Sequence, residues 1–253
     1  MSGEGRPLPD NIHTGIQVSM ILSRPRSARF RIAVLGWLLL TLCVIPLAEA
    51  GAQSGGSAQR EAKPRPTSTP YTGDFSHFEY PGREKKLQID RVMDLLQIKT
   101  GSKVADIGAG GGWFTVRAAN RVGASGVVYA EDINPESIQY IRNRADHEHL
   151  GNVQEVLGHA DDPMLPANSV DAALLLKTYH EVADPVALLR NLRKSLRPQG
   201  RVGIIDRNGN GADHGVDKEV VVKEAAEAGY KLVGTYDFVK PDKEDYFLVF
   251  EPE

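Results

Sequence analysis

Cysteine is nearly absent from this 253-residue chain, which contains only Cys43. One cysteine cannot form an intrachain disulfide, and Cys43 falls in an N-terminal apolar run. Thiolate chemistry and cysteine-based zinc sites are therefore excluded from the rest of the chain. An excess of positive charge is also missing, because the formal net charge is −3. General nucleic-acid binders are usually basic, so we expect no nucleic-acid partner.

The N-terminal apolar run, residues 32–47, has 16 residues and is short for a membrane helix, which needs about 20. Four arginines precede it, no two of them adjacent, and Ala48-Glu49-Ala50 follows it. A basic region, an apolar core and a small-x-small end are typical of a secretory signal peptide. We interpret residues 1–50 as a cleaved export signal or, if uncleaved, a membrane anchor, with a buried core helix as the remaining alternative. The protein is therefore expected to be exported, meeting a membrane only through residues 32–47.

Large apolar side chains are scarce in the next segment, residues 51–74, which is rich in Gly, Ser, Pro, Gln and Thr. Such a segment cannot bury enough apolar surface to order itself. We predict a disordered linker here, leading to one domain at residues 75–253. Four aromatic residues lie around that boundary and predict either a lid over a binding site or a hydrophobic staple: Tyr71, Phe75, Phe78 and Tyr80.

Short apolar runs alternate with segments of helical periodicity from residue 84 onward. This alternation predicts an α/β domain with a doubly wound, mostly parallel sheet. We expect strands at residues 104–107, 126–130, 153–157, 170–176, 202–205, 231–239 and 246–250. We expect helices at 84–96, from 113, from 135, from 185 and at 217–228, with a turn at 197–200. Ligands of such sheets bind outside the carboxyl ends of the strands.

The densest motif runs from Val104 to Thr115 and reads VADIGAGGGWFT: an apolar strand, a glycine turn and a helix start. Glycines allow positive φ and close approach of a ligand, and a helix N-terminus adds N–H groups. The dinucleotide fingerprint G-x-G-x-x-G is not met, because Trp113 stands where its third glycine would be. Asp106 would repel a phosphate but suits a cationic ligand such as S-adenosyl-L-methionine, which carries an ammonium and a sulfonium.

This motif resembles motif I of the class I S-adenosylmethionine-dependent methyltransferases. Glu131-Asp132 before Ile-Asn-Pro resembles the family segment that holds the ribose hydroxyls, with Asp132 the first choice and Glu131 the second. Residues 158–162 resemble the adenine-side motif, and residues 196–201 are similar to the turn before the fifth strand. The resemblance covers roughly residues 84–250 and is nearest to a group of exported bacterial proteins with a Tyr-His-Glu run after the fourth strand. It implies a seven-stranded Rossmann-like sheet with the last strand antiparallel.

The resemblance also implies which residues bind the cofactor: Asp106, Gly108, Ala109, Gly110, Gly112, Glu131, Asp132, Ala160, Asp161 and Asp162. Two positions depart from the family. His159 stands where many relatives have the aspartate that contacts the adenine amino group, which leaves Asp161 or Asp162 for that contact. Lys177 stands where metal-dependent relatives have an aspartate, so we expect no metal, although Asp206 and Asn208 would otherwise suit one.

Three residues are candidates for contact with the methyl acceptor. His180 follows the buried fourth strand and is either a general base, because its ordinary pKa lies near neutrality, or a structural histidine. Tyr179 either lines the pocket or packs, and Asp206 either touches the acceptor or is a loop charge. In-line positioning of the acceptor needs no strong base.

The sequence thus predicts an enzyme that transfers a methyl group from S-adenosyl-L-methionine to a small-molecule acceptor, whose identity it does not give. One alternative is a module that binds an adenosyl ligand without catalysis. The other is a nicotinamide-dependent oxidoreductase, which Trp113 disfavours.

Overall fold

The computed structural model describes residues 65, 67, 71–210 and 214–253. The predicted export signal or anchor at residues 1–50, and most of the predicted linker, lie outside these residues. In the part of the chain that is described, no helix is long and apolar enough to cross a membrane.

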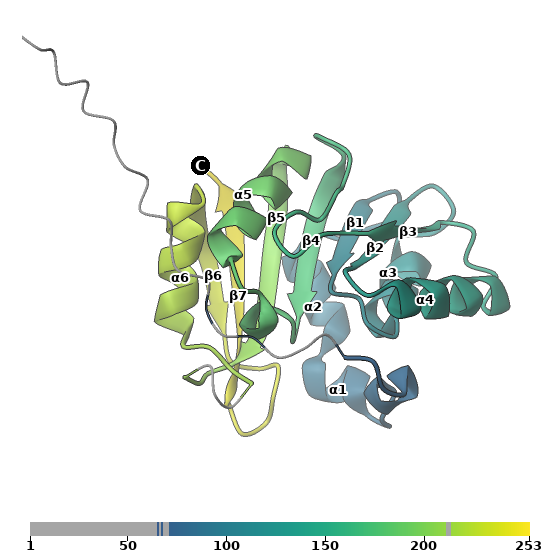
Figure 1. Ribbon diagram of the computed structural model, residues 1–253, viewed down its shortest axis with the longest axis horizontal. Coiled ribbons are helices and arrows are strands. Elements are labelled where there is room, and N and C mark those ends of the chain that lie inside the picture. Colours follow the sequence, from purple (N-terminus) through teal and green to yellow (C-terminus); the bar gives the residue numbers. More distant parts are fainter. Residues whose placement is uncertain (1–64, 66, 68–70, 211–213) are drawn as a thin grey trace, which may run out of the picture. The chain divides into compact units, whose positions relative to one another are not determined.

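The domain is built on a seven-stranded sheet with the order β3-β2-β1-β4-β5-β7-β6 (Figure 1). β7 runs antiparallel to its neighbours β5 and β6, whereas the other neighbouring pairs are parallel. The strands are β1 Lys103–Ile107, β2 Val127–Asp132, β3 Val153–Leu157, β4 Val170–Leu176, β5 Leu196–Arg207, β6 Tyr230–Tyr236 and β7 Asp245–Pro252. The mostly parallel sheet with an antiparallel last strand, expected from the sequence, is confirmed.

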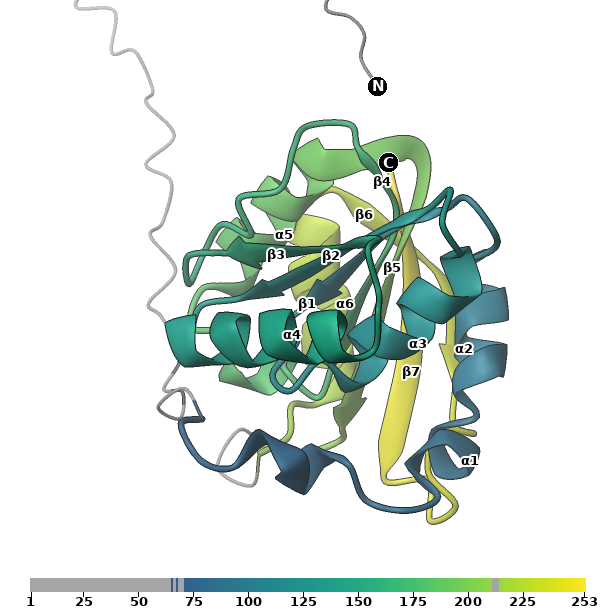
Figure 2. The same cartoon turned by 90° about the vertical axis from the view of Figure 1, so that its right-hand side faces the viewer.

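Helices cover both faces of this sheet, as Figures 1 and 2 show from two sides. One apolar core lies between the sheet and α2 and α3, and includes Val92 and Phe114. The other lies under α5 and α6, and includes Leu189 and Val221. The helices are α1 Arg83–Leu87, α2 Ile89–Leu95, α3 Trp113–Val122, α4 Pro135–His147, α5 Pro185–Ser195 and α6 Lys218–Glu227, with short 3-10 helices η1 Phe75–Phe78 and η2 Tyr179–Glu181.

Two helices begin at the caps that the sequence predicts. The Asn134 side chain accepts a hydrogen bond from the Glu136 backbone N–H, and proline opens α4. The Asp184 side chain accepts from the Ala187 N–H, and proline opens α5 as well. An Asn or Asp cap satisfies an otherwise unpaired N–H group, and proline at the first helical position has no N–H to lose.

Two elements differ from the expectation in more than the positions of their ends. The single helix expected at residues 84–96 is divided into α1 and α2, because Gln88 adopts a left-handed conformation with φ 47°. The turn expected at residues 197–200 lies within β5 as an irregularity in its pairing with β4. Val170 pairs with Leu196, but Ala172, two residues on, pairs with Arg201. The extra residues of β5 therefore bulge out of the ladder instead of ending the strand.

The strand order places β1 at the point where the direction in which successive strands are added to the sheet reverses. The chain passes from β1 outward to β2 and β3, then returns to β4 on the other side of β1. At such a switch point the loops leaving neighbouring strands diverge and open a crevice at the carboxyl edge. The glycine turn after β1 and the Tyr-His-Glu run after β4 both lie at this edge.

Candidate functional site

The glycine turn between β1 and α3 requires glycine at particular positions. Gly108, Gly110 and Gly112 have φ of 68°, 55° and 72°, values that other residues adopt only with strain. A Cβ added to Gly108 would lie 2.3 Å from the Thr178 Cγ2 atom. Glycine therefore lets the turn lie directly against the segment that follows β4.

The backbone N–H groups of this turn are largely occupied by the end of β2. Asp132 Oδ2 accepts a hydrogen bond from the Gly110 N–H at 2.8 Å, and Glu131 Oε2 accepts from the Gly108 N–H at 3.3 Å. The Ala109 N–H donates to the Glu131 carbonyl oxygen at 2.8 Å. A pyrophosphate binds such a turn through free N–H groups. Here those groups already have acceptors, and a carboxylate beside them would repel a phosphate.

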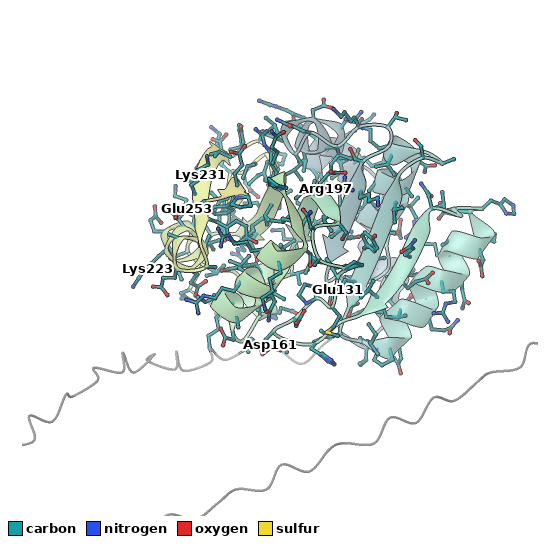
Figure 3. All side chains as sticks on the ribbon, turned by 90° about the horizontal axis from the view of Figure 1, so that it is seen from above. Glu131, Asp161, Arg197, Lys223, Lys231 and Glu253 are labelled. Carbon is teal, nitrogen blue, oxygen red and sulfur yellow. The ribbon has the colours of Figure 1, made fainter. Side chains whose placement is uncertain are left out.

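Glu131 is a buried acid, only 2% exposed. Burial raises its pKa to about 8, against the smaller opposing effect of the Gly108 hydrogen bond. Its carboxyl group therefore keeps its proton at neutral pH and can donate as well as accept. Figure 3 labels Glu131 among the strands and Asp161 at the outer edge of the domain.

Asp106, at the end of β1, is also buried and lines the cavity described below. Its Oδ2 atom accepts a hydrogen bond from the Thr115 hydroxyl at 2.6 Å. Burial raises the pKa of Asp106 to about 6, although the hydrogen bonds from Thr115 act to lower it. At neutral pH the group is mostly ionised and places a negative charge beneath the glycine turn.

A cavity of about 680 Å³ opens at this edge of the sheet. Its volume lies in the range of sites for drug-sized ligands. Its walls are the turn after β1, the end of β2, the loop after β3 and the segment after β4. The lining residues in these four parts fall at 106–111, 131–133, 159–160 and 176–183, with gaps.

Aromatic side chains from outside the sheet form a further wall, which we call the aromatic wall: Tyr71, Phe75 and Phe78. The Tyr71 ring meets the rings of Phe75 and Phe78 edge-on, at centroid distances of 5.9 and 5.2 Å. The Asn134 side chain donates to the Tyr71 carbonyl oxygen at 2.9 Å, which ties this wall to the start of α4. Tyr80 is 47% exposed and does not line the cavity. The segment that carries the aromatic wall thus covers the cavity and also fixes the chain before α1 to the domain.

The predicted linker contributes a second anchor through Arg65. Its guanidinium donates to the carbonyl oxygens of Val182 at 2.8 Å and Tyr179 at 2.7 Å, and lies over the Tyr179 ring at 5.0 Å. Its backbone N–H donates to the Ala183 carbonyl oxygen. The described part of the segment expected to be a linker is therefore docked on the domain.

His180 lines the cavity, and Asp206 hydrogen-bonds to it on the side away from the cavity. The His180 Nδ1 atom lies 2.9 Å from Asp206 Oδ1, and its backbone N–H donates to Asp206 Oδ2 at 2.9 Å. Burial opposes the charge on the ring. Hydrogen bonds to Asp206 and Glu181 outweigh that effect and raise the pKa of His180 to about 9. At neutral pH the ring is consequently a donor rather than a ready base.

The structure does not bring every predicted site residue to the cavity. Asp206 is fully buried and orders His180 instead of facing an acceptor. Tyr179 is also fully buried, and its hydroxyl donates to Glu224 at 2.7 Å, so it packs. The loop after β3 lines the cavity with residues 159–160 but not with its two aspartates. Asp162, for instance, accepts from the Met164 N–H.

Gly112 likewise lies off the wall, because it caps α3. Several polar residues that line the cavity were not predicted as site residues, among them Arg83 and His214. Arg83 is the first residue of α1. Its guanidinium lies over the Trp113 ring at 4.3 Å and donates to the Phe78 carbonyl oxygen at 2.7 Å. His214 belongs to the polar loop after β5, which the sequence marked only as lying at the correct edge.

A family model described as a methyltransferase domain matches residues 98–236, more than half of the chain.

This chain belongs to the methyltransferase domain family.

Curated relatives align with part of this chain. The ubiquinone/menaquinone biosynthesis C-methyltransferase UbiE of Hahella chejuensis is 32% identical over 115 residues, covering 45% of this chain and 46% of the relative. The nocamycin O-methyltransferase of Saccharothrix syringae is 32% identical over 114 residues, covering 45% of this chain and 41% of the relative. The chain therefore aligns with less than half the length of these proteins.

Solved structures share the fold. A SAM-dependent methyltransferase from Aquifex aeolicus superposes with a TM-score of 0.65 at 23% identity, covering 71% of this chain and 97% of that chain. The glycine turn, Glu131, Asp132 and His180 lie inside the range that the family model matches, whereas the aromatic wall precedes it.

Proposed function

We propose that this protein transfers a methyl group from S-adenosyl-L-methionine to a small-molecule acceptor in the cavity at the carboxyl edge of its sheet. The observation that carries the proposal is that backbone N–H groups of the glycine turn already have hydrogen-bond acceptors. Its N–H groups at 108 and 110 are held by acidic side chains, so the turn is not a phosphate cradle. A cationic adenosyl ligand suits it better than a dinucleotide does.

The residues present fit that cofactor. Asp106 and the glycine turn would hold its methionine part, because an ionised carboxylate favours a nearby ammonium. Asp132 would accept from the ribose hydroxyls, and residues 159–160 would lie along the adenine. The bound cofactor supplies an activated methyl group on a sulfonium. The aromatic wall excludes water from the cavity, and the residues after β4 place the acceptor.

In-line placement is the main contribution expected of the protein, since a positioned nucleophile needs no strong base. His180 is a polar group on the cavity wall whose orientation is fixed through the buried Asp206. We propose that it helps to place the acceptor. Transfer of labelled methyl groups to a metabolite extract, compared between wild type and His180→Ala, measures this contribution. Wild-type transfer also separates an enzyme from a module that only binds an adenosyl ligand.

Ligand-dependent thermal stability of the purified full chain tests the cofactor. At about 100 times its Kd, S-adenosylhomocysteine should stabilise the protein by about 3 kcal/mol, or roughly 5–10 °C in Tm. NAD should give no shift. Asp132→Ala should remove the response, whereas Asp146→Ala, an exposed aspartate on α4, should keep it. Stabilisation by NAD alone would refute the proposal, and an unchanged response in Asp132→Ala would refute the ribose assignment.

We also propose that residues 1–50 direct export, or anchor the protein to a membrane through residues 32–47. The support is the order of a basic region, an apolar run and a small-x-small end. A fusion of these residues to a reporter enzyme that is active only outside the cytoplasm should become active. Loss of the signal on deleting residues 32–47 is the expected control, and an inactive fusion would refute export.

A further inference from the structure

Three metal-binding side chains meet on the wall of the cavity: His180, Glu181 and His214. Each offers one ligand atom, and these atoms lie within 4.8 Å of one another. We infer that this cluster binds a divalent transition metal of the zinc class, on the acceptor side of the methyltransferase site.

His180 has the environment of a metal-binding histidine. Its Nδ1 atom lies 2.9 and 3.0 Å from the two Asp206 carboxylate oxygens, and Asp206 also accepts from the His180 and Arg207 backbone N–H groups. A carboxylate behind a histidine fixes the proton on that nitrogen and aims the other nitrogen at the metal. Here Asp206 fixes the proton on Nδ1, which leaves Nε2 as the ligand atom once the metal has displaced the Nε2 proton to solvent.

A carboxylate and a second imidazole lie beside that nitrogen. One Glu181 carboxylate oxygen is 3.6 Å from His180 Nε2, close to the separation of two atoms that bind the same metal ion. The His214 ring meets the His180 ring edge-on at a centroid distance of 5.8 Å and an angle of 85°. The two rings come from different loops, after β4 and after β5, and converge on one point.

The chemistry of these donors selects the metal. Two imidazoles and one carboxylate are a ligand set of zinc and related metals, whereas magnesium prefers oxygen donors alone. Zinc bonds to nitrogen and oxygen at about 2.0–2.2 Å, so tetrahedral ligand atoms lie about 3.3 Å apart. The ligand atoms of the cluster, all within 4.8 Å of one another, would have to move closer together around a bound metal. Three protein ligands leave a fourth position open, and this one faces the cavity.

Resting on the proposed function, this open position would take an oxygen atom of the acceptor after its proton has left to solvent. The methyl group would then pass from the sulfonium to that oxygen, with S-adenosylhomocysteine as the leaving group. The inference revises the expectation of no metal, which rested on Lys177. Lys177 Nζ pairs with Asp245 at 2.6 Å, so it does not occupy the point on which the two histidines converge. The acceptors that fit are molecules with a hydroxyl or carboxylate oxygen able to bind a metal.

Calorimetric titration of the chelator-treated full chain with Zn²⁺ tests the inference, with Mg²⁺ in a parallel arm. We expect one Zn²⁺ per chain and no saturable binding of Mg²⁺. His214→Ala removes an exposed ligand, so the fold should persist and affinity should fall by at least about tenfold. Asp206→Asn should weaken binding by about 10- to 100-fold, as loss of a supporting carboxylate does. His147→Ala, at an exposed histidine on α4, is the matched control and should bind like wild type.

Absence of saturable Zn²⁺ binding, or equal affinity in His214→Ala and wild type, would overturn the inference and leave a proton shared between His180 and Glu181. Thermal shift with S-adenosylhomocysteine, measured without metal on each preparation, separates the two proposals. If that ligand binds and Zn²⁺ does not, the metal site fails alone. If Zn²⁺ binds in the expected pattern and the adenosyl ligand does not, the metal site stands and the proposed function fails.

Discussion

Replacement of Glu131 by glutamine should stabilise the ligand-free protein, increasingly so as the pH rises. The folded protein holds the Glu131 proton up to a pKa of about 8, whereas the ordinary value is 4.5. Because the folded state binds this proton more tightly than the unfolded chain, stability falls as the pH rises between these values. The loss is about 1.4 kcal/mol per pH unit. It approaches about 5 kcal/mol above pH 8, a large part of the 5–15 kcal/mol that is typical of a whole domain.

Urea denaturation of wild type and Glu131→Gln at pH 5, 6, 7 and 8 measures this effect. Glutamine has nearly the same shape and cannot ionise, so the difference in unfolding free energy should grow in favour of the variant at each step. Glu136→Gln, at an exposed position in the first turn of α4, is the control, and its difference should stay nearly constant. A gap between Glu131→Gln and wild type that does not change from pH 5 to pH 8 would refute the reasoning.

Three further substitutions probe the cofactor side. Gly108→Ala places a methyl group 2.3 Å from Thr178 Cγ2 at φ 68°, so affinity for S-adenosylhomocysteine should fall by at least about tenfold in a thermal-shift titration; unchanged affinity would contradict the close approach. Thr115→Val removes a buried hydrogen bond to Asp106 and should lower the unfolding free energy, measured by urea denaturation, by about 2 kcal/mol. An unfolding free energy equal to that of wild type would show that this bond does not stabilise the fold. Phe78→Ala opens the aromatic wall and should raise the ligand Kd by about tenfold while ligand-free Tm changes little; a large fall in Tm instead would make Phe78 a structural residue.

Elements whose boundaries are set by neighbouring residues were predictable from the sequence. The strands at 153–157 and 170–176 fall where the apolar runs place them, and the caps Asn134 and Asp184 start their helices. The division of the helix at Gln88 was not predictable from periodicity. Leu87 and Ile89, on either side of it, are both buried, so the apolar pattern continues across the break.

Site residues were predictable from the sequence where their structure depends on residues close by in the chain. The glycines of the turn after β1 predict its conformation, and Asp132 was predictable because it lies at the end of an apolar strand. Asp206 was found as a strand-end residue, but its partner, His180, lies 26 positions away and is set by the packing of β4 against β5. Arg65 reaches carbonyl groups more than 110 positions along the chain. Contacts of that range depend on the finished fold, so no local pattern marks them.

The aromatic wall lies outside the range that the family model matches. That range begins at residue 98, yet Tyr71, Phe75, Phe78 and Arg83 all line the cavity. A fragment that begins at residue 98 would therefore keep the glycine turn but lose one side of the cavity. Binding assays on this protein need a chain that includes residues 71–83.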